Sequence, residues 1–186
     1  MRLMRTAALI LLLGVGLVVS AAEVESRVLT HYVPQDVLEA AVRKEGWTEI
    51  PLNVKGGVRK GDVVRIWAGG SIDRGGDVPG QNVAGPDGLA WRAGSVSDRR
   101  PGERLALSPE SGHAHALLFK TEGPGVQKCR PAGKPLEIKL TKDREKLWIG
   151  FNDERGRYQD NHLGKGLRHE LDPLWVRIEV VRIIVD

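Results

Sequence analysis

The sequence predicts an all-β fold, an antiparallel β-sandwich or jelly roll with one short N-terminal helix. From Trp47 onward, short segments that alternate apolar and polar residues recur along the chain, as half-buried strands do. Turn-forming pairs such as Gly56-Gly57 separate these segments, and helical spacing of apolar residues is found in one short stretch. Short strands with glycine-rich turns and almost no helix are typical of sandwiches and barrels.

The elements are expected in a simple order. The helix lies at residues 34–44, where apolar residues have helical spacing and Gly46 provides a stop. Alternation then predicts strands at residues 50–54, 62–68, 115–120, 134–140, 146–151 and 174–185. In the last of these the apolar phase slips by one residue after Val180, which predicts a bulge or bend.

The middle of the chain, residues 69–112, has a different composition. It is rich in Gly, Pro, Arg and Asp and poor in apolar residues. It is too long for an ordinary connection between strands. We therefore expect either a functional loop region or one weak strand near residues 88–92.

The N-terminus resembles a secretory signal peptide. A short basic start precedes an apolar run at residues 7–19, and small residues follow at 19–22. A membrane anchor is the alternative, but the run is short for a full span. Cleavage near Ala22 would leave a leader with the helix at residues 23–46 and a β-sandwich domain at residues 47–186. We therefore expect a secreted or periplasmic protein that is not membrane-bound after cleavage.

The charge balance argues against nucleic-acid binding. The chain has 28 basic and 24 acidic residues, a net charge of +4. Without Arg2 and Arg5 the balance is 26 against 24, or +2. The charges alternate in sign, whereas nucleic-acid binding requires a basic stripe with aromatic platforms.

The single cysteine, Cys129, has no partner for a disulfide within the chain. In an oxidising compartment such a thiol is buried, paired between chains or reactive. No local His or Asn pattern supports a nucleophile, so we expect a tolerated cysteine.

The loop at residues 151–161 is the first candidate for chemistry. It follows a predicted strand and combines Asp153, Asp160 and Asn161 around a turn at Gly156. A backbone carbonyl near Arg157 completes a set of oxygen ligands that suits calcium, although the EF-hand spacing is absent. The alternative is a solvated hairpin loop in which Asn and Asp satisfy turn geometry.

Several segments resemble the PA-I galactophilic lectin family in order and spacing, from Trp47 to the C-terminus. They are residues 46–50, 58–70, 85–88, 116–120, 147–153, 158–161 and 176–178. The pair Asn152-Asp153, followed by a turn and Asp160-Asn161, is the most specific part. The resemblance implies a galactose-binding-like β-sandwich that binds carbohydrate through Ca²⁺. A homo-oligomer or a multivalent glycan would strengthen such weak binding.

The resemblance also implies site residues. Asp153 would supply a carboxylate, Asp160 and Asn161 the adjacent pair of side chains, and Arg157 a backbone carbonyl. The second carbonyl would lie near Asp73. The family has an amide where this chain has Asp160, so the substitution keeps an oxygen ligand and adds a negative charge.

The sugar side matches the family less well. There, sugar hydroxyls replace water on calcium, and a neighbouring loop adds a His and a Gln that are not visible in residues 84–88. Asp87 is the residue retained, Trp91 is the best aromatic candidate for stacking on a sugar, and His162 lies beside the predicted ligands. The ligand is therefore a galactoside or another glycan.

Other candidates have simpler interpretations. His113 and His115 are two residues apart, as zinc or sugar ligands on a strand would be, but no third ligand is near. We therefore expect histidines of a surface strand or a loop. Trp67, Trp148 and Trp175 lie in predicted strands and are expected to pack in the core or sandwich, and not to stack on a sugar.

We expect a binding module without catalytic activity. The alternative is a structural module of the cell envelope in which calcium staples the loop and no sugar binds. A glycoside hydrolase using Asp153 and Asp160 is disfavoured, because both carboxylates are needed for the cation. No nucleophile elbow, H-E-x-x-H motif or phosphate loop is present.

Overall fold

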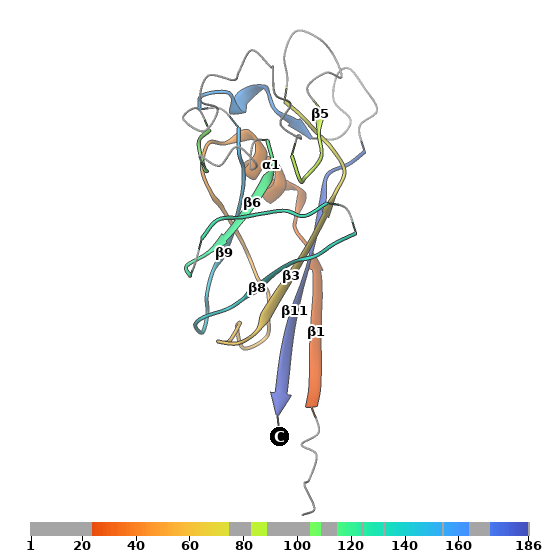
Figure 1. Ribbon diagram of the computed structural model, residues 1–186, viewed down its shortest axis with the longest axis vertical. Helices are drawn as coiled ribbons and strands as arrows, with labels where there is room; N and C mark the ends of the chain where they lie inside the picture. The colour runs from red at the N-terminus through yellow and green to blue at the C-terminus, as the bar shows by residue number, and fades with distance from the viewer. Residues whose placement is uncertain are drawn as a thin grey trace, which may run out of the picture.

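The computed structural model confirms the predicted fold class: three antiparallel sheets and one short α-helix in the residues that it describes (Figure 1). It describes residues 24–74, 83–88, 105–108, 115–123, 125–131, 133–153, 155–163 and 172–185, with the backbone alone at 24–27 and 183–185. The predicted signal peptide and Trp91 lie outside these ranges.

The first sheet has the strand order β1-β11-β3-β8. Its strands are β1 (Val24–Tyr32), β11 (Trp175–Val185), β3 (Val63–Gly69) and β8 (Leu136–Lys139). Alternate residues of β3 and β11 are fully buried, among them Ile66 and Ile178. This period of two gives the sheet one apolar face.

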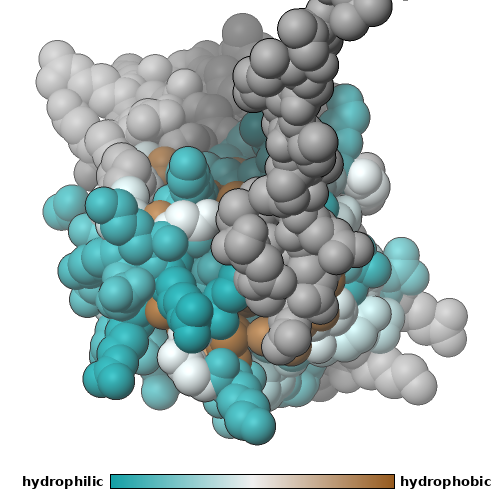
Figure 2. Space-filling view, turned by 90° about the horizontal axis from the view of Figure 1, so that it is seen from below, coloured by the Kyte–Doolittle hydropathy of each residue, from teal (hydrophilic) through white to brown (hydrophobic). Residues whose placement is uncertain are grey.

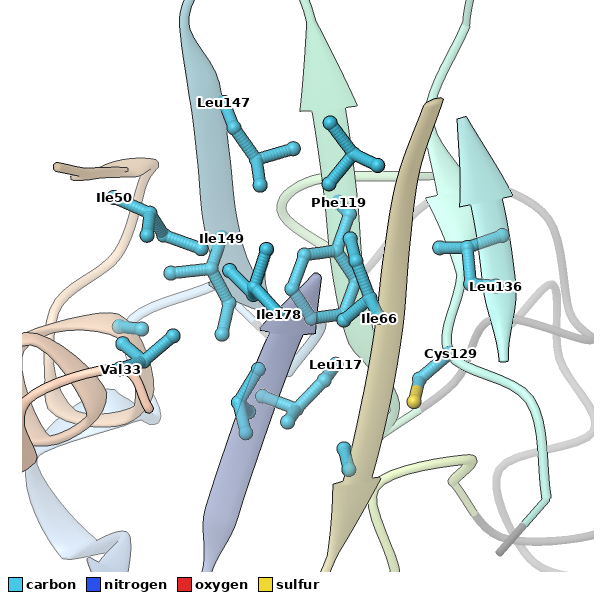
Figure 3. Close-up of a cluster of buried hydrophobic side chains, with 14 of the residues drawn as sticks. Val33, Ile50, Ile66, Leu117, Phe119, Cys129, Leu136, Leu147, Ile149 and Ile178 are labelled. Atoms are coloured by element: carbon cyan, nitrogen blue, oxygen red, sulfur yellow. The ribbon is translucent and has the colours of Figure 1, made fainter. Parts of the chain in front are cut away.

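The second sheet has the order β2-β9-β6-β7. Its strands are β2 (Thr48–Ile50), β9 (Leu147–Phe151), β6 (Leu117–Thr121) and β7 (Gln127–Lys128). Figure 3 shows Phe119 and Ile149 from this sheet facing Ile66 and Ile178 from the first. The core of the sandwich is this apolar layer between the two sheets.

Helix α1 (Gln35–Arg43) confirms the predicted helix. It buries Leu38, Ala41 and Val42 in the same core as the sheets, which is the apolar stripe that the sequence spacing predicts.

A third, small sheet lies at the end of the molecule where β5 is labelled in Figure 1. It consists of β10 (His162–Leu163), β4 (Ile72–Asp73) and β5 (Val83–Ala84), in that order. A 3₁₀ turn, η2 (Tyr158–Asp160), precedes β10. The turn η2 lies in the loop at residues 151–161, and β10 directly follows this loop. Strands β4 and β5 lie in the first part of the glycine-rich middle region.

Strand β1 was not predicted, and of the bulge or bend predicted in the last strand, the bulge is wrong. β1 and β11 pair without interruption from Val24↔Val185 to Tyr32↔Arg177. The pairing of β11 with β3 ends at Val181↔Val63. Within the described residues, β11 pairs beyond this point with β1 alone, and the apolar phase slips where the pairing with β3 ends.

The prediction that Trp67, Trp148 and Trp175 pack in the core is also wrong. Trp175 is 41% exposed, and the other two are half-buried on outer faces of the sheets. The Arg177 guanidinium lies 4.2 Å from the centre of the Trp67 ring, and Lys120 Nζ lies 5.6 Å from that of Trp148. These rings are covered by long cationic side chains on neighbouring strands.

The two ends of the sandwich differ. Figure 2 views the end where β1 begins and β11 ends, and there most of the described residues in view are hydrophilic, with a few hydrophobic residues between them. The opposite end carries the small third sheet (Figure 1). No helix among the described residues is long and apolar enough to cross a membrane.

Cys129 is a buried core residue, 1% exposed. Burial, together with the nearby charge of Asp87, raises the pKa of its thiol to about 12. Because the thiolate is the reactive form, we expect a thiol-specific reagent to leave the native protein unlabelled and to label one thiol per chain in denaturant. Rapid labelling without denaturant would contradict this burial.

Candidate metal centre

The strand-end loop is folded back on β9 by a buried tyrosine. The Tyr158 hydroxyl donates a hydrogen bond to the Phe151 carbonyl (2.8 Å) and accepts one from the Asp153 backbone amide (3.3 Å). Burial raises the pKa of Tyr158, so the hydroxyl keeps its proton and remains a donor. Gly156 has φ of 76°, which permits the tight turn between the two ends of the loop.

Asn152 and Asp153 are neighbours with different roles. Asn152 is fully buried, and its Oδ1 accepts hydrogen bonds from the amides of Leu107 (3.0 Å) and Ser108 (3.1 Å). Its Nδ2 donates to the Ser108 carbonyl (3.0 Å). Asn152 thus anchors residues 105–108 to the end of β9. The Asp153 carbonyl adds a bond from Ala106 (3.0 Å), so this second segment supports the Asp153 backbone.

Asn161 is held at the end of helix α1. It is fully buried, and its Nδ2 donates to the carbonyl of Val42 (3.0 Å). This bond fixes the orientation of the amide and leaves Oδ1 as a buried oxygen without a hydrogen-bond donor; Oδ1 of Asp160 is in the same condition. A buried acceptor left unpaired costs about 1–3 kcal/mol, and a cation bound to such an oxygen would offset that cost.

The register of the third sheet places Asp73 beside this loop. Asp73 pairs with His162, the residue after Asn161, and on its other side with Val83 of β5. The backbone of β4 therefore runs next to His162, the residue that follows the pair Asp160-Asn161.

The loop after β5 reaches the same end of the sandwich. Gly88 donates to the Gly85 carbonyl (3.0 Å), closing a turn, and Leu117 at the start of β6 donates to the Pro86 carbonyl (2.8 Å). Asp87 is thus held next to the beginning of β6. His162 and Asp87 belong to segments that flank β4.

His115 lies beside Asp153. Its Nδ1 is 3.2 Å from Asp153 Oδ1, close but not aligned as a hydrogen bond, and its Nε2 is 2.8 Å from Arg74 Nη1. His115 lies in a turn before β6, as the loop alternative predicts, but its side chain is only 17% exposed. The contact with Arg74 joins residues 41 positions apart, and no local pattern in the sequence predicts it.

The structure thus brings most predicted site residues to one end of the sandwich. Asp153 is buried, Asp160 is half-buried and Arg157 is exposed at the start of η2. No cluster of three or more His, Cys, Asp or Glu side chains suited to a metal occurs within the described ranges. The predicted ligand set has two carboxylates, and an amide and backbone carbonyls supply its other oxygens. Trp91 and His113 lie outside the described residues.

The fold and the loop define an all-β sandwich with an oxygen-rich loop at one end. No family model matches the chain, and no curated protein matches it. One solved structure similar to it is described as "EclA N-terminal domain; PllA-like lectin". The two are 18% identical over 81% of this chain and 92% of that chain, with a TM-score of 0.40.

Proposed function

We propose that this protein is a calcium-dependent carbohydrate-binding protein, secreted or periplasmic, without catalytic activity. The observation that carries the proposal is that two consecutive residues, Asp160 and Asn161, each have a buried side-chain oxygen, Oδ1, without a hydrogen-bond donor. Hard cations bind carboxylate, amide and carbonyl oxygens, and all three kinds occur in this loop.

Five residues would hold the ion. Asp153 and Asp160 would contribute carboxylates, Asn161 its amide oxygen, and Arg157 and Asp73 backbone carbonyls. The two carboxylates match the charge of a divalent ion. When bound, calcium supplies open coordination positions that sugar hydroxyls can occupy.

The protein's own residues would orient the sugar. Asp87 and His162 belong to the segments on either side of β4 and offer hydrogen-bond partners for sugar hydroxyls. Asp87 is an acceptor, and the His162 ring can donate or accept. With neither the His nor the Gln of galactophilic lectins visible, the ligand class is carbohydrate, a galactoside or another glycan.

A structural role for the ion is the second candidate. The loop joins three parts of the molecule: Asn161 bonds to helix α1 at Val42, Asn152 bonds to Ser108, and Tyr158 bonds to β9 at Phe151. An ion bound here would staple these segments together even if no sugar bound.

Calcium titration followed by glycan binding tests the proposal. Protein stripped with chelator should bind calcium in the micromolar-to-millimolar range by calorimetry, and calcium should raise the melting temperature by mass action. Asp153→Ala should lose both effects. Asp36→Ala, at an exposed position in the first turn of α1, is the matched control and should keep both.

Glycan-array binding with and without chelator then separates the two candidates. Calcium-dependent array binding supports the carbohydrate-binding proposal. Calcium binding that raises the melting temperature without any glycan binding favours the structural role. A melting curve that does not respond to calcium, with no heat of binding, rules out both.

A further inference from the structure

A chain of three side chains connects strand β4 to the strand-end loop. Arg74 Nη1 lies 2.8 Å from Nε2 of His115, whose Nδ1 lies 3.2 Å from Asp153 Oδ1. Arg74 directly follows Asp73, the last residue of β4. These contacts therefore connect the backbone at Asp73, which would supply a carbonyl ligand, to the carboxylate of Asp153, which would be a second ligand.

The backbone of His115 is held in an unusual conformation. Its φ is 53°, in the left-handed region that only a few per cent of residues other than Gly occupy, His, Asn and Asp more often than the rest. A hydrogen bond from its amide to the Asn152 carbonyl (2.8 Å) fixes it there. Such conformations persist where the surrounding structure enforces them, and they occur often at functional sites. Here the conformation accompanies an imidazole placed beside Asp153.

The contacts define the proton positions on the imidazole. A guanidinium can only donate, so Nε2 of His115 accepts from Arg74. In this neutral tautomer the ring proton is on Nδ1, the nitrogen that faces Asp153. A small rotation of either side chain would convert the 3.2 Å contact into a hydrogen bond to the carboxylate.

We propose that His115, supported by Arg74, is a positioning residue for calcium binding: it orients the Asp153 carboxylate toward the ion. This inference rests on the proposed function. Outer groups that hydrogen-bond to a ligating carboxylate fix its orientation before the metal arrives, and so reduce the cost of ordering it on binding.

The test compares calcium affinity with stability in the absence of calcium. His115→Gly removes the imidazole and relieves the left-handed backbone strain. We expect the calcium affinity to fall about 10–100-fold, while the melting temperature in chelator does not fall. Terbium luminescence and calorimetry measure the affinity without any glycan.

Three further variants sharpen the comparison. His115→Asn keeps an N–H donor and tolerates the left-handed conformation, so it should lose less affinity than His115→Gly. Arg74→Gln removes the guanidinium and should also weaken calcium binding. The control is Arg144→Gly: Arg144 has φ of 54° and lies in the turn before β9, so the substitution relieves the same strain elsewhere and should leave the affinity unchanged.

The outcomes separate this inference from the function on which it depends. Wild-type protein that binds no calcium overturns both. Calcium binding by the wild type, together with wild-type affinity in His115→Gly, overturns only the positioning role. A fall in the melting temperature of His115→Gly in chelator with unchanged affinity assigns His115 to the fold instead.

Discussion

Substitution of Gly70 by alanine is expected to destabilise the protein by about 2–5 kcal/mol, from backbone strain and steric overlap together. Gly70 joins β3 to β4 with φ of 92°. A Cβ at this position would lie 2.6 Å from the Pro173 carbonyl carbon and 2.7 Å from Leu174 Cα. Backbone atoms cannot move aside as the end of a flexible side chain can, so the two segments would have to separate.

A comparison of Gly70→Ala with Gly61→Ala in urea denaturation separates the cost of steric overlap from the cost of backbone strain. Gly61 has nearly the same conformation, φ of 93°, but no atom lies within 4 Å of its Cβ position. Its substitution should cost about 1–2 kcal/mol, the strain of the left-handed conformation alone. Equal losses in the two variants would show that the approach of residues 173–174 to Gly70 is looser than the structure indicates.

Arg182→Ala is the second substitution with a large expected effect. It should lower the free energy of unfolding by about 3 kcal/mol, because it leaves the buried Asp62 carboxylate without its charged partner. Asp62 is 3% exposed and accepts hydrogen bonds from Arg182 Nε (3.0 Å) and Nη2 (2.7 Å) and from the Arg59 amide (2.8 Å). Arg182 Nη2 also donates to the Gly57 carbonyl (2.9 Å). The guanidinium thereby ties β11 to the turns that flank the start of β3.

Arg65→Ala is the matched control for this experiment. Arg65 makes an ion pair of 2.8 Å with Glu137, but the two side chains are 43% and 52% exposed. Such a surface pair contributes about 0–1 kcal/mol. If Arg182→Ala costs no more than Arg65→Ala in chemical denaturation, Asp62 is better solvated than its burial indicates.

The effect of Arg182→Ala should depend on pH. Burial on its own raises the pKa of Asp62, but hydrogen bonds from Arg182 and Arg59 and the charge of Arg182 outweigh burial and lower it. A carboxylate with a lowered folded-state pKa stabilises the protein above its unfolded pKa, about 3.9. That contribution is lost as the pH falls through the folded-state value. The difference in stability between wild type and Arg182→Ala should therefore be greatest near neutral pH and shrink in acid.

Local periodicity was sufficient to predict the helix and most of the strands that line the core, because burial imposes a period on each of them. The strand predicted at residues 50–54 is an exception, since β2 ends at Ile50. It could not predict β1, an edge strand whose partner, β11, lies at the other end of the sequence. The prediction for the tryptophans was wrong for a related reason. Trp67 is covered by Arg177 from the neighbouring strand, and a sequence does not show which side chain lies across from a ring.

The candidate site, too, could be predicted only in part from the sequence. Its acidic and amide residues could be chosen from the sequence because they lie together in one short loop. The different roles of Asn152 and Asp153 could not, since they depend on residues 105–108 meeting the end of β9. His115 could be singled out from the sequence, but its contact with Arg74 could not be predicted. Neither a contact between residues far apart in the chain nor a left-handed backbone produces a periodic pattern in the sequence.

The uninterrupted ladder between β1 and β11 has a practical consequence for any assay on a surface. Val24 and Val185 are paired neighbours at the tip of this ribbon, at the end of the molecule opposite β5 (Figure 1). A biotin, affinity tag or immobilising linker attached beyond either residue would therefore extend from the base of the sandwich. The protein would stand upright on a sensor chip or bead, with its oxygen-rich loop directed into solution.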